Sequence, residues 1–194
     1  MKRVIIIHGW DGSPNEPLIR WLKKKLEEKG FGIEAPVMPN TEEPVIEEWV
    51  NKLEKVVGRP DKDTILVGHS IGCQAILRYL EKMPPAARVG GVVFIAPWFT
   101  LSNLEEEESW QIADPWLKTP IKETDVIKHT SKIIAIFSDN DPYVPSENID
   151  LFKNRFNAEV IVESQKGHFT EDDGIKELPS ALRVILKLGE DILA

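Results

Sequence analysis

The sequence predicts a three-layer α/β fold in which helices cover both faces of a mostly parallel sheet of about six strands. Short runs rich in Val and Ile recur along the chain, as expected for strands that are buried on both faces. Between them lie stretches whose apolar residues recur at helical spacing, and this alternation implies parallel strands joined by right-handed crossovers. The length of 194 residues and the hydrophobic content of 42% predict a single domain, residues 1–194, with a substantial core.

The expected strands are short, and the first helices between them have clear ends. The strands occupy residues 4–7, 32–37, 64–69, 91–96, 132–138 and 158–163. The first helix ends at Gly30, and the second ends at Gly58 and Pro60. The apolar face of the first helix is formed by Leu18, Ile19, Leu22 and Leu26. The apolar face of the second helix is formed by Ile46, Trp49, Val50, Leu53 and Val57.

Two more helices are expected further along the chain. One follows Ser70 and ends before Pro84, and the last begins near Pro179. The apolar positions of the helix after Ser70 are Ala75, Ile76, Leu77 and Leu80. The apolar positions of the last helix are Leu182, Ile185 and Leu186, with Ile192 as a further candidate.

One segment, at about residues 97–131, is too long to be a simple connection between the fourth and fifth strands. It holds three of the six tryptophans and an acidic run from Glu105 to Glu108. The three tryptophans are Trp98, Trp110 and Trp116. We expect this insert to form a short helix and a small, lid-like cover. The acidic run by itself is typical of a solvated helix face.

The segment Gly68-His69-Ser70-Ile71-Gly72 matches the G-x-S-x-G pattern of a nucleophile elbow. An apolar run that is expected to form a strand precedes it, and a predicted helix follows it. The chain must turn sharply at such a position, so the two glycines give room around a strained serine. The pattern predicts that Ser70 is a catalytic nucleophile exposed at the carboxyl end of its strand.

Candidate partners for this serine follow the fifth and sixth strands. Asp139 and Asp141 come directly after the fifth strand, and His168 comes after the sixth. A serine hydroxyl is a weak nucleophile that needs an adjacent base, and a carboxylate must hold the imidazole of that base in the right tautomer. His168 is therefore the expected base, while the residues alone leave the choice between the two aspartates open.

The motifs at the strand ends resemble those of a known family. They are His8-Gly9-Trp10 after the first strand, the segment from Gly68 to Gly72, Asp141-Pro142-Tyr143-Val144-Pro145 and Gly167-His168-Phe169. Together they are similar to the small, nearly lidless α/β-hydrolases that include the retinoblastoma-binding serine hydrolases and their bacterial relatives. The resemblance covers nearly the whole chain. It implies an α/β-hydrolase fold with a minimal lid.

The resemblance also implies roles for individual residues. The Asp-x-x-Val-Pro pattern makes Asp141, ahead of Asp139, the carboxylate that orients His168. The backbone N–H groups of Trp10 and Ile71 are expected to form the oxyanion hole. The Leu-x-Cys-x-Glu motif of the vertebrate members is absent around Cys73, so their partner binding is not carried over. Cys73 is expected to be a small core residue.

Aromatic residues follow most of the expected strands and indicate a substrate pocket. These residues are Trp10, Trp98, Phe99, Tyr143 and Phe169. In an open α/β sheet, ligands bind at the carboxyl ends of the strands. An aromatic-lined pocket beside Ser70 suits an acyl or aryl group.

Composition excludes several other functions. The net charge of −8 argues against a nucleic-acid partner, because phosphates require a basic surface. The apolar runs are far shorter than a membrane span. No spacing typical of metal ligands or of a dinucleotide site is present, so neither a metal nor another cofactor is expected. The single cysteine fits a reducing compartment and a cytoplasmic location. The oligomeric state is left open.

The sequence therefore predicts a serine hydrolase that cleaves small carboxylic esters through an acyl-enzyme at Ser70. The same Ser70, Asp141 and His168 would also serve a thioesterase, an amidase or an aminopeptidase. A non-catalytic binding protein with a vestigial site is the alternative from another class. An intact set of catalytic residues argues against it, because a strained serine has no purpose without catalysis.

Overall fold

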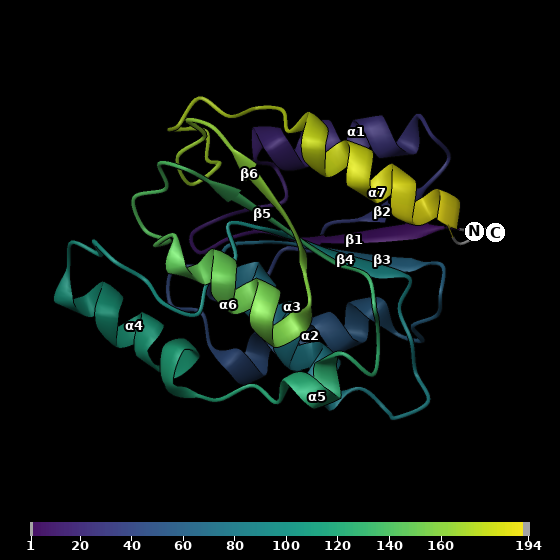
Figure 1. The fold of residues 1–194 in the computed structure, drawn as a ribbon, viewed down its shortest axis with the longest axis horizontal. Helices are drawn as coiled ribbons and strands as arrows, with labels where there is room; N and C mark the ends of the chain where they lie inside the picture. Colours follow the sequence, from purple (N-terminus) through teal and green to yellow (C-terminus); the bar gives the residue numbers. More distant parts are fainter. Residues whose placement is uncertain (1, 192–194) are drawn as a thin grey trace.

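A computed structural model describes residues 2–191 as a six-stranded, entirely parallel sheet in the order β2-β1-β3-β4-β5-β6 (Figure 1). The strands are β1 (Arg3–Ile7), β2 (Gly32–Glu34), β3 (Thr64–His69), β4 (Gly91–Ile95), β5 (Ile133–Ser138) and β6 (Glu159–Glu163). The predicted α/β class and the parallel sheet are confirmed. The second strand is shorter than the predicted 32–37, because Pro36 has no N–H to donate to a neighbouring strand.

Helices cover both faces of this sheet. They are α1 (Pro17–Glu27), α2 (Ile46–Val57), α3 (Ile71–Lys82), α4 (Glu107–Lys118), α5 (Glu123–Val126), α6 (Glu147–Phe156) and α7 (Pro179–Asp191). Helices α1 and α7 lie on one face, and α2, α3 and α6 lie on the other (Figure 1). Ile192, a candidate for the last helix, lies outside the described residues. None of the helices within residues 2–191 is both long enough and apolar enough to cross a membrane.

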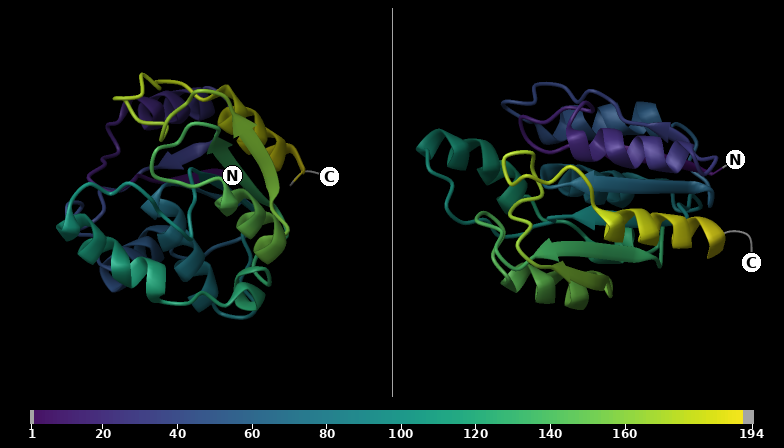
Figure 2. Two further views of the ribbon diagram at one scale, coloured as in Figure 1. Left: turned by 60° about the vertical axis from the view of Figure 1, so that its left-hand side comes forward. Right: turned by 90° about the horizontal axis from the view of Figure 1, so that it is seen from above.

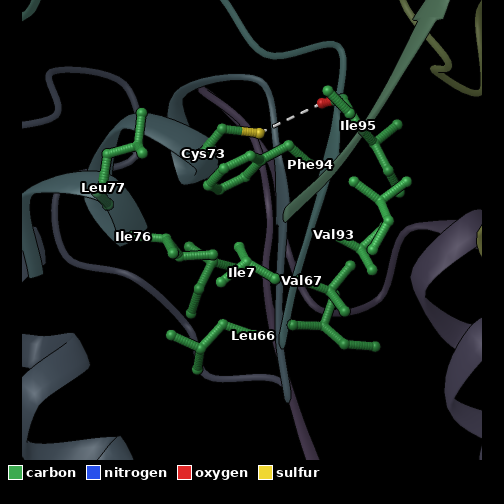
Figure 3. Close-up of a cluster of buried hydrophobic side chains, with 14 of the residues drawn as sticks. Ile7, Leu66, Val67, Cys73, Ile76, Leu77, Val93, Phe94 and Ile95 are labelled. Carbon is green, nitrogen blue, oxygen red and sulfur yellow. Dashed lines mark hydrogen bonds between the residues drawn. The ribbon is translucent and has the colours of Figure 1, made fainter. Parts of the chain in front are cut away.

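The core beside the nucleophile is formed by β1, β3 and β4 together with the first turns of α3 (Figure 3). Leu66 and Val67 of β3 and Val93 of β4 are fully buried, as expected for central parallel strands. Cys73 lies among these side chains, and its Sγ donates to the carbonyl oxygen of Ile95 at 3.4 Å. Cys73 is therefore a buried core residue, as its position predicted.

The segment 97–131 contains α4 and α5. Helix α4 lies at the end of the molecule toward which the strands point (Figures 1 and 2). Trp116 fastens this helix, because its ring packs edge-on against Trp49 of α2 at 6.1 Å between ring centres. The Trp116 indole also donates from Nε1 to the carbonyl oxygen of Pro44 at 2.8 Å. The insert is thus anchored near the carboxyl end of α4.

Candidate active site

Ser70 occupies the single position between the end of β3 and the start of α3. Its backbone has φ 52° and ψ −119°, and this positive φ is costly for a residue with a side chain. The backbone N–H of Ser70 donates to the carbonyl oxygen of Ile95 at 2.9 Å, which holds the turn against β4. The strand-to-helix turn thereby presents the side chain at the carboxyl edge of the sheet.

The two glycines of the motif are required by close backbone contacts. A Cβ on Gly68 would lie 2.8 Å from the backbone nitrogen of Cys73. A Cβ on Gly72 would lie 2.5 Å from the carbonyl oxygen of Ile7 in the neighbouring strand. Both contacts are with backbone atoms and are shorter than real Cβ contacts. The spacing of the G-x-S-x-G motif is therefore a packing requirement of this turn.

A chain of hydrogen bonds joins Ser70 to His168 and Asp141. The Nε2 atom of His168 lies 2.9 Å from Ser70 Oγ, and its Nδ1 atom lies 2.8 Å from Asp141 Oδ2. The Asp141 side chain is 2% exposed, and its other oxygen accepts from the backbone N–H groups of Tyr143 and Val144. A carboxylate at Nδ1 places the ring hydrogen there, so Nε2 is free to accept the hydroxyl proton.

Asp139, the other candidate carboxylate, lies elsewhere. Its two oxygens accept from the hydroxyl of Ser164 at 2.8 Å and from the backbone N–H of Gln165 at 2.7 Å. These hydrogen bonds, led by that of Gln165, lower the pKa of the Asp139 carboxyl. Asp139 therefore ties the loop after β5 to the loop after β6, and Asp141 is the carboxylate that contacts His168.

The other three histidines hold backbone groups. His8 is fully buried, and its Nε2 accepts from the backbone N–H of Met38 while Nδ1 donates to Gly9. Burial lowers the pKa of His8.

The pKa of His69 is lowered to about 4 by burial and by the adjacent His168. The Nε2 atom of His69 donates to the carbonyl oxygen of His168 at 2.8 Å. His129 is 2% exposed, and its Nδ1 forms a hydrogen bond with the carbonyl oxygen of Ala87 at 2.9 Å.

The loop after β1 lies directly against the nucleophile. A Cβ on Gly9 would lie 3.6 Å from Ser70 Cβ, so the chain passes close to the serine at this position. Trp10 follows Gly9, and its indole donates to the carbonyl oxygen of Glu42 at 2.8 Å. Ile71 begins α3, where the first N–H groups have no partner within the helix. Trp10 and Ile71 are thus placed beside Ser70, and their oxyanion-hole role stays a prediction.

A cavity of about 840 Å³ opens above Ser70 and His168. Trp10, Trp98 and Tyr143, three of the expected pocket residues, line it. The Trp98 side chain is almost fully buried, with Nε1 3.4 Å from Ser70 Oγ. The Tyr143 ring meets the His168 ring edge-on at 5.4 Å. These aromatic groups border the serine hydroxyl on the cavity side.

Phe99 and Phe169, the other two expected pocket residues, do not line the cavity. The Phe99 ring stacks on Phe152 at 4.9 Å and carries the Arg155 guanidinium at 3.9 Å from its centre. Phe169 is 1% exposed within the core. Adjacent residues such as Trp98 and Phe99 direct their side chains differently, which the position after a strand does not reveal. The predicted pocket is corrected at these two positions.

A buried polar network that the sequence analysis missed holds the backbone of Trp98. The Gln74 side chain on α3 donates to the Trp98 carbonyl and accepts from Arg78 at 3.0 Å. Arg78 also donates to the carbonyl oxygens of Trp116 and Thr119 at the end of α4. Polar residues four apart on a helix that is otherwise buried are the sequence signal for such a network. The network connects the nucleophile helix to the insert.

Comparison with known proteins identifies the family. A sequence model of the family described as "Serine hydrolase" matches residues 4–187. The chain belongs to the serine hydrolase family. This match spans the turn that carries Ser70 and the loops that carry Asp141 and His168.

Relatives of this serine hydrolase cover nearly the same length. YdeN of Bacillus subtilis (strain 168) is 29% identical over 184 residues, which are 95% of this chain and 94% of YdeN. The crystal structure of the B. subtilis ydeN gene product superposes with a TM-score of 0.88 and covers 97% of this chain and 98% of that chain. Serine hydrolase RBBP9 of Rattus norvegicus is 27% identical over 167 residues, 85% of this chain and 80% of RBBP9. These relatives confirm the expected family.

More distant structures share only the fold. Est1E from Butyrivibrio proteoclasticus, solved with ferulic acid, gives a TM-score of 0.72 at 16% identity, over 100% of this chain and 88% of that chain. The α/β-hydrolase fold that the motifs predicted is confirmed by this likeness and by that to the ydeN product.

Proposed function

We propose that this serine hydrolase cleaves small carboxylic esters through an acyl-enzyme at Ser70. The observation that carries the proposal is the continuous hydrogen-bonded chain from Ser70 Oγ through His168 to Asp141, with bonds of 2.9 and 2.8 Å. Those distances are within the range needed for proton transfer. The family assignment supports hydrolysis as the reaction class.

In the proposed reaction, Ser70 Oγ attacks the ester carbonyl carbon as its proton moves to Nε2 of His168. The tetrahedral oxyanion is stabilised by the N–H groups of Trp10 and Ile71. Collapse of this intermediate breaks the bond to the alkoxy group, which leaves with the proton held by His168. Water then attacks the acyl-enzyme with the same proton transfers, so the acid is released and Ser70 is restored. Asp141 holds the imidazole and stabilises its charged form.

The nucleophile is tested by labelling and by turnover. Wild type should react with a fluorophosphonate probe and hydrolyse p-nitrophenyl esters. Ser70→Ala should lose labelling, and its kcat should drop by at least about 10³-fold. Ser146→Ala, a change at an exposed serine outside the cavity, is the control that should keep both signals. Retained ester hydrolysis in Ser70→Ala would end the proposed mechanism.

The acyl-binding wall is tested at Trp98. We expect Trp98→Ala to move the preference among p-nitrophenyl esters toward longer acyl chains, because loss of a buried aromatic ring opens space beside Ser70. Trp98→Phe keeps most of the apolar area and should keep the preference for chain length. If Trp98→Ala only loses stability and retains the wild-type chain-length profile, Trp98 packs the sheet edge without contacting the acyl group. Matched esters, thioesters and amides in the same assay test the ester preference.

A further inference from the structure

The lining of the catalytic cavity has a one-sided charge. Of its 23 residues, nine are Asp or Glu and none is Lys or Arg. The whole chain has 24 basic and 32 acidic residues, so the absence of basic residues from the lining is not a matter of overall composition. The Ser70 hydroxyl and the His168 ring identify this cavity as the candidate active site. The carboxylates therefore line a site that was recognised without reference to them.

Carboxylates from separate segments converge on this cavity. Glu105 and Glu106 directly precede the insert helix α4, and Glu108 lies in its first turn. Glu171 and Asp172 come from the loop that follows His168. Acidic residues at the start of a helix have an ordinary explanation in the helix dipole. The helix dipole does not explain Glu171 and Asp172, because they lie in the loop after His168. What the two groups of carboxylates share is their position in the lining of the cavity.

Two further segments add to the same lining: the loop after β1, with Asp11 and Glu16, and the pair Glu42 and Glu43. Asp11 follows β1, and burial together with nearby Glu42 raises the pKa of its carboxyl. Burial also raises the pKa of Glu16, with Glu171 adding to the rise, although Glu16 accepts one hydrogen bond from the Ser13 N–H. Within residues 2–191, no lining carboxylate forms an ion pair with a Lys or Arg. The negative charge of the cavity is therefore not compensated by protein cations.

The distribution of these groups fits an extended organic cation better than a metal ion. No three Asp, Glu, His or Cys side chains among the described residues are grouped as ligands of one metal. The carboxylates are instead spread around a cavity that also presents the aromatic residues Trp10 and Tyr143. Carboxylates and aromatic faces are the two groups that attract ammonium cations.

We infer that the substrates of this enzyme carry a positive charge, in the form of a protonated or quaternary amine, on the acyl or the alcohol part of the ester. The inference rests on the proposed ester hydrolysis and names the substrate class. The uncompensated carboxylates favour entry of the cation and disfavour an anionic ester.

Pairs of isosteric esters test the inference on both sides of the reacting bond. For the alcohol side, acetylcholine is compared with the uncharged 3,3-dimethylbutyl acetate. For the acyl side, the p-nitrophenyl ester of 4-(trimethylammonio)butyrate is compared with that of 5,5-dimethylhexanoate. At low ionic strength, kcat/KM for at least one cationic ester should exceed that of its neutral partner by on the order of tenfold. Because exposed charges are screened, the ratio should fall as salt is added.

Matched variants assign the effect to the lining. The triple change Glu105→Gln, Glu106→Gln and Glu108→Gln should lower the cation-to-neutral ratio. The control triple changes Glu47, Glu159 and Glu177 to Gln. It changes the net charge by the same amount at exposed positions outside the cavity, and it should keep the cation-to-neutral ratio. An equal fall in the control would show that overall charge, and not the cavity, sets the preference, which would overturn the inference.

The remaining outcomes separate the inference from the proposed function. If neutral esters are hydrolysed and the enzyme reacts with the fluorophosphonate, but cationic esters are no better substrates on either side, the charge inference is wrong and ester hydrolysis stands. If no ester is hydrolysed and no labelling occurs, the proposed function itself fails.

Discussion

The contacts of Ser70 explain how one residue is kept in an unfavourable backbone conformation. A non-glycine residue at positive φ costs on the order of 1–3 kcal/mol, and it persists only where the surroundings impose it. Here the turn is held in this conformation by the hydrogen bond from the Ser70 N–H to the Ile95 carbonyl oxygen. The close approach of Gly68 and Gly72 to neighbouring backbone atoms holds it further. The buried central strands on either side of the turn therefore stabilise the strained backbone of Ser70.

At the scale of residues, Asp141 and Asp139 provide a matched pair. We expect Asp141→Asn to reduce kcat by on the order of 10⁴-fold, because the amide favours the wrong tautomer of His168. Asp139→Asn removes a carboxylate that bonds Ser164 and Gln165, and its effect on kcat should be much smaller. Steady-state kinetics with a p-nitrophenyl ester measure both. Reversed results would move the orienting carboxylate to Asp139.

His69 gives a prediction about stability and pH. Its pKa is about 4 in the folded protein, below the ordinary 6.5, so the unfolded chain binds a proton that the folded protein does not. Stability should therefore fall as the pH drops from about 6.5 toward 4, by about 2 kcal/mol between pH 7.5 and pH 5. His69→Asn should lose this part of the dependence. Urea unfolding at the two pH values measures it, and an unchanged dependence in the variant would contradict the assignment.

For single residues, the sequence predicted where each candidate catalytic residue lies in the fold but not which way its side chain points. Ser70, His168 and both aspartates were found because each follows a strand whose carboxyl end lies at one edge. The choice between the aspartates depends on the turn after β5, where the N–H groups of Tyr143 and Val144 hold one Asp141 oxygen. Motif resemblance supplied that choice, while no spacing rule could.

At the scale of elements, helix α6 was not predicted although its apolar residues have helical spacing. Ile149, Phe152 and Phe156 recur at intervals of three and four, but only ten residues form the helix. Such a short pattern between two strong strand signals is easily assigned to a loop. The position of Phe99 depends on α6, because Phe152 and Phe156 of this helix take up its ring.

Helix α4 offers two tryptophans with opposite environments. Trp116 is 2% exposed and packs on Trp49, so Trp116→Ala should reduce the free energy of unfolding by about 3–5 kcal/mol. Trp110 is 38% exposed, and Trp110→Ala should cost no more than about 1 kcal/mol. Urea denaturation of the two variants measures the difference. Equal losses would show that the anchoring of α4 does not depend on Trp116.

At the scale of the whole molecule, the buried apolar residues within 2–191, apart from Ala113, form one contiguous cluster. It joins strands β1, β3, β4 and β5 to helices on both faces of the sheet. We therefore expect a single cooperative unfolding transition in urea, with coincident curves from far-UV circular dichroism and tryptophan fluorescence. Two separated transitions would show that part of the chain unfolds independently, contrary to the predicted single domain.

The parallel sheet was predictable from the alternation of strands and helices, but its strand order was not. Chain order does not indicate that β1 lies between β2 and β3, since this depends on the direction in which each crossover passes. The acidic character of the cavity could not be predicted either, because chain order does not indicate which loops meet in space. Glu42, Glu106 and Glu171 are far apart in the chain, and only the fold brings them to one lining.

The burial of Cys73 has a practical consequence for thiol chemistry. It is the only cysteine of the chain, its side chain is fully buried, and burial raises the pKa of its thiol. Since thiolates are the species that react with maleimides, the native cysteine is protected by the fold. A cysteine introduced at an exposed position of α4 would therefore be the one reactive thiol. A fluorophore attached there reports on this helix while Cys73 stays unmodified in its place against β4.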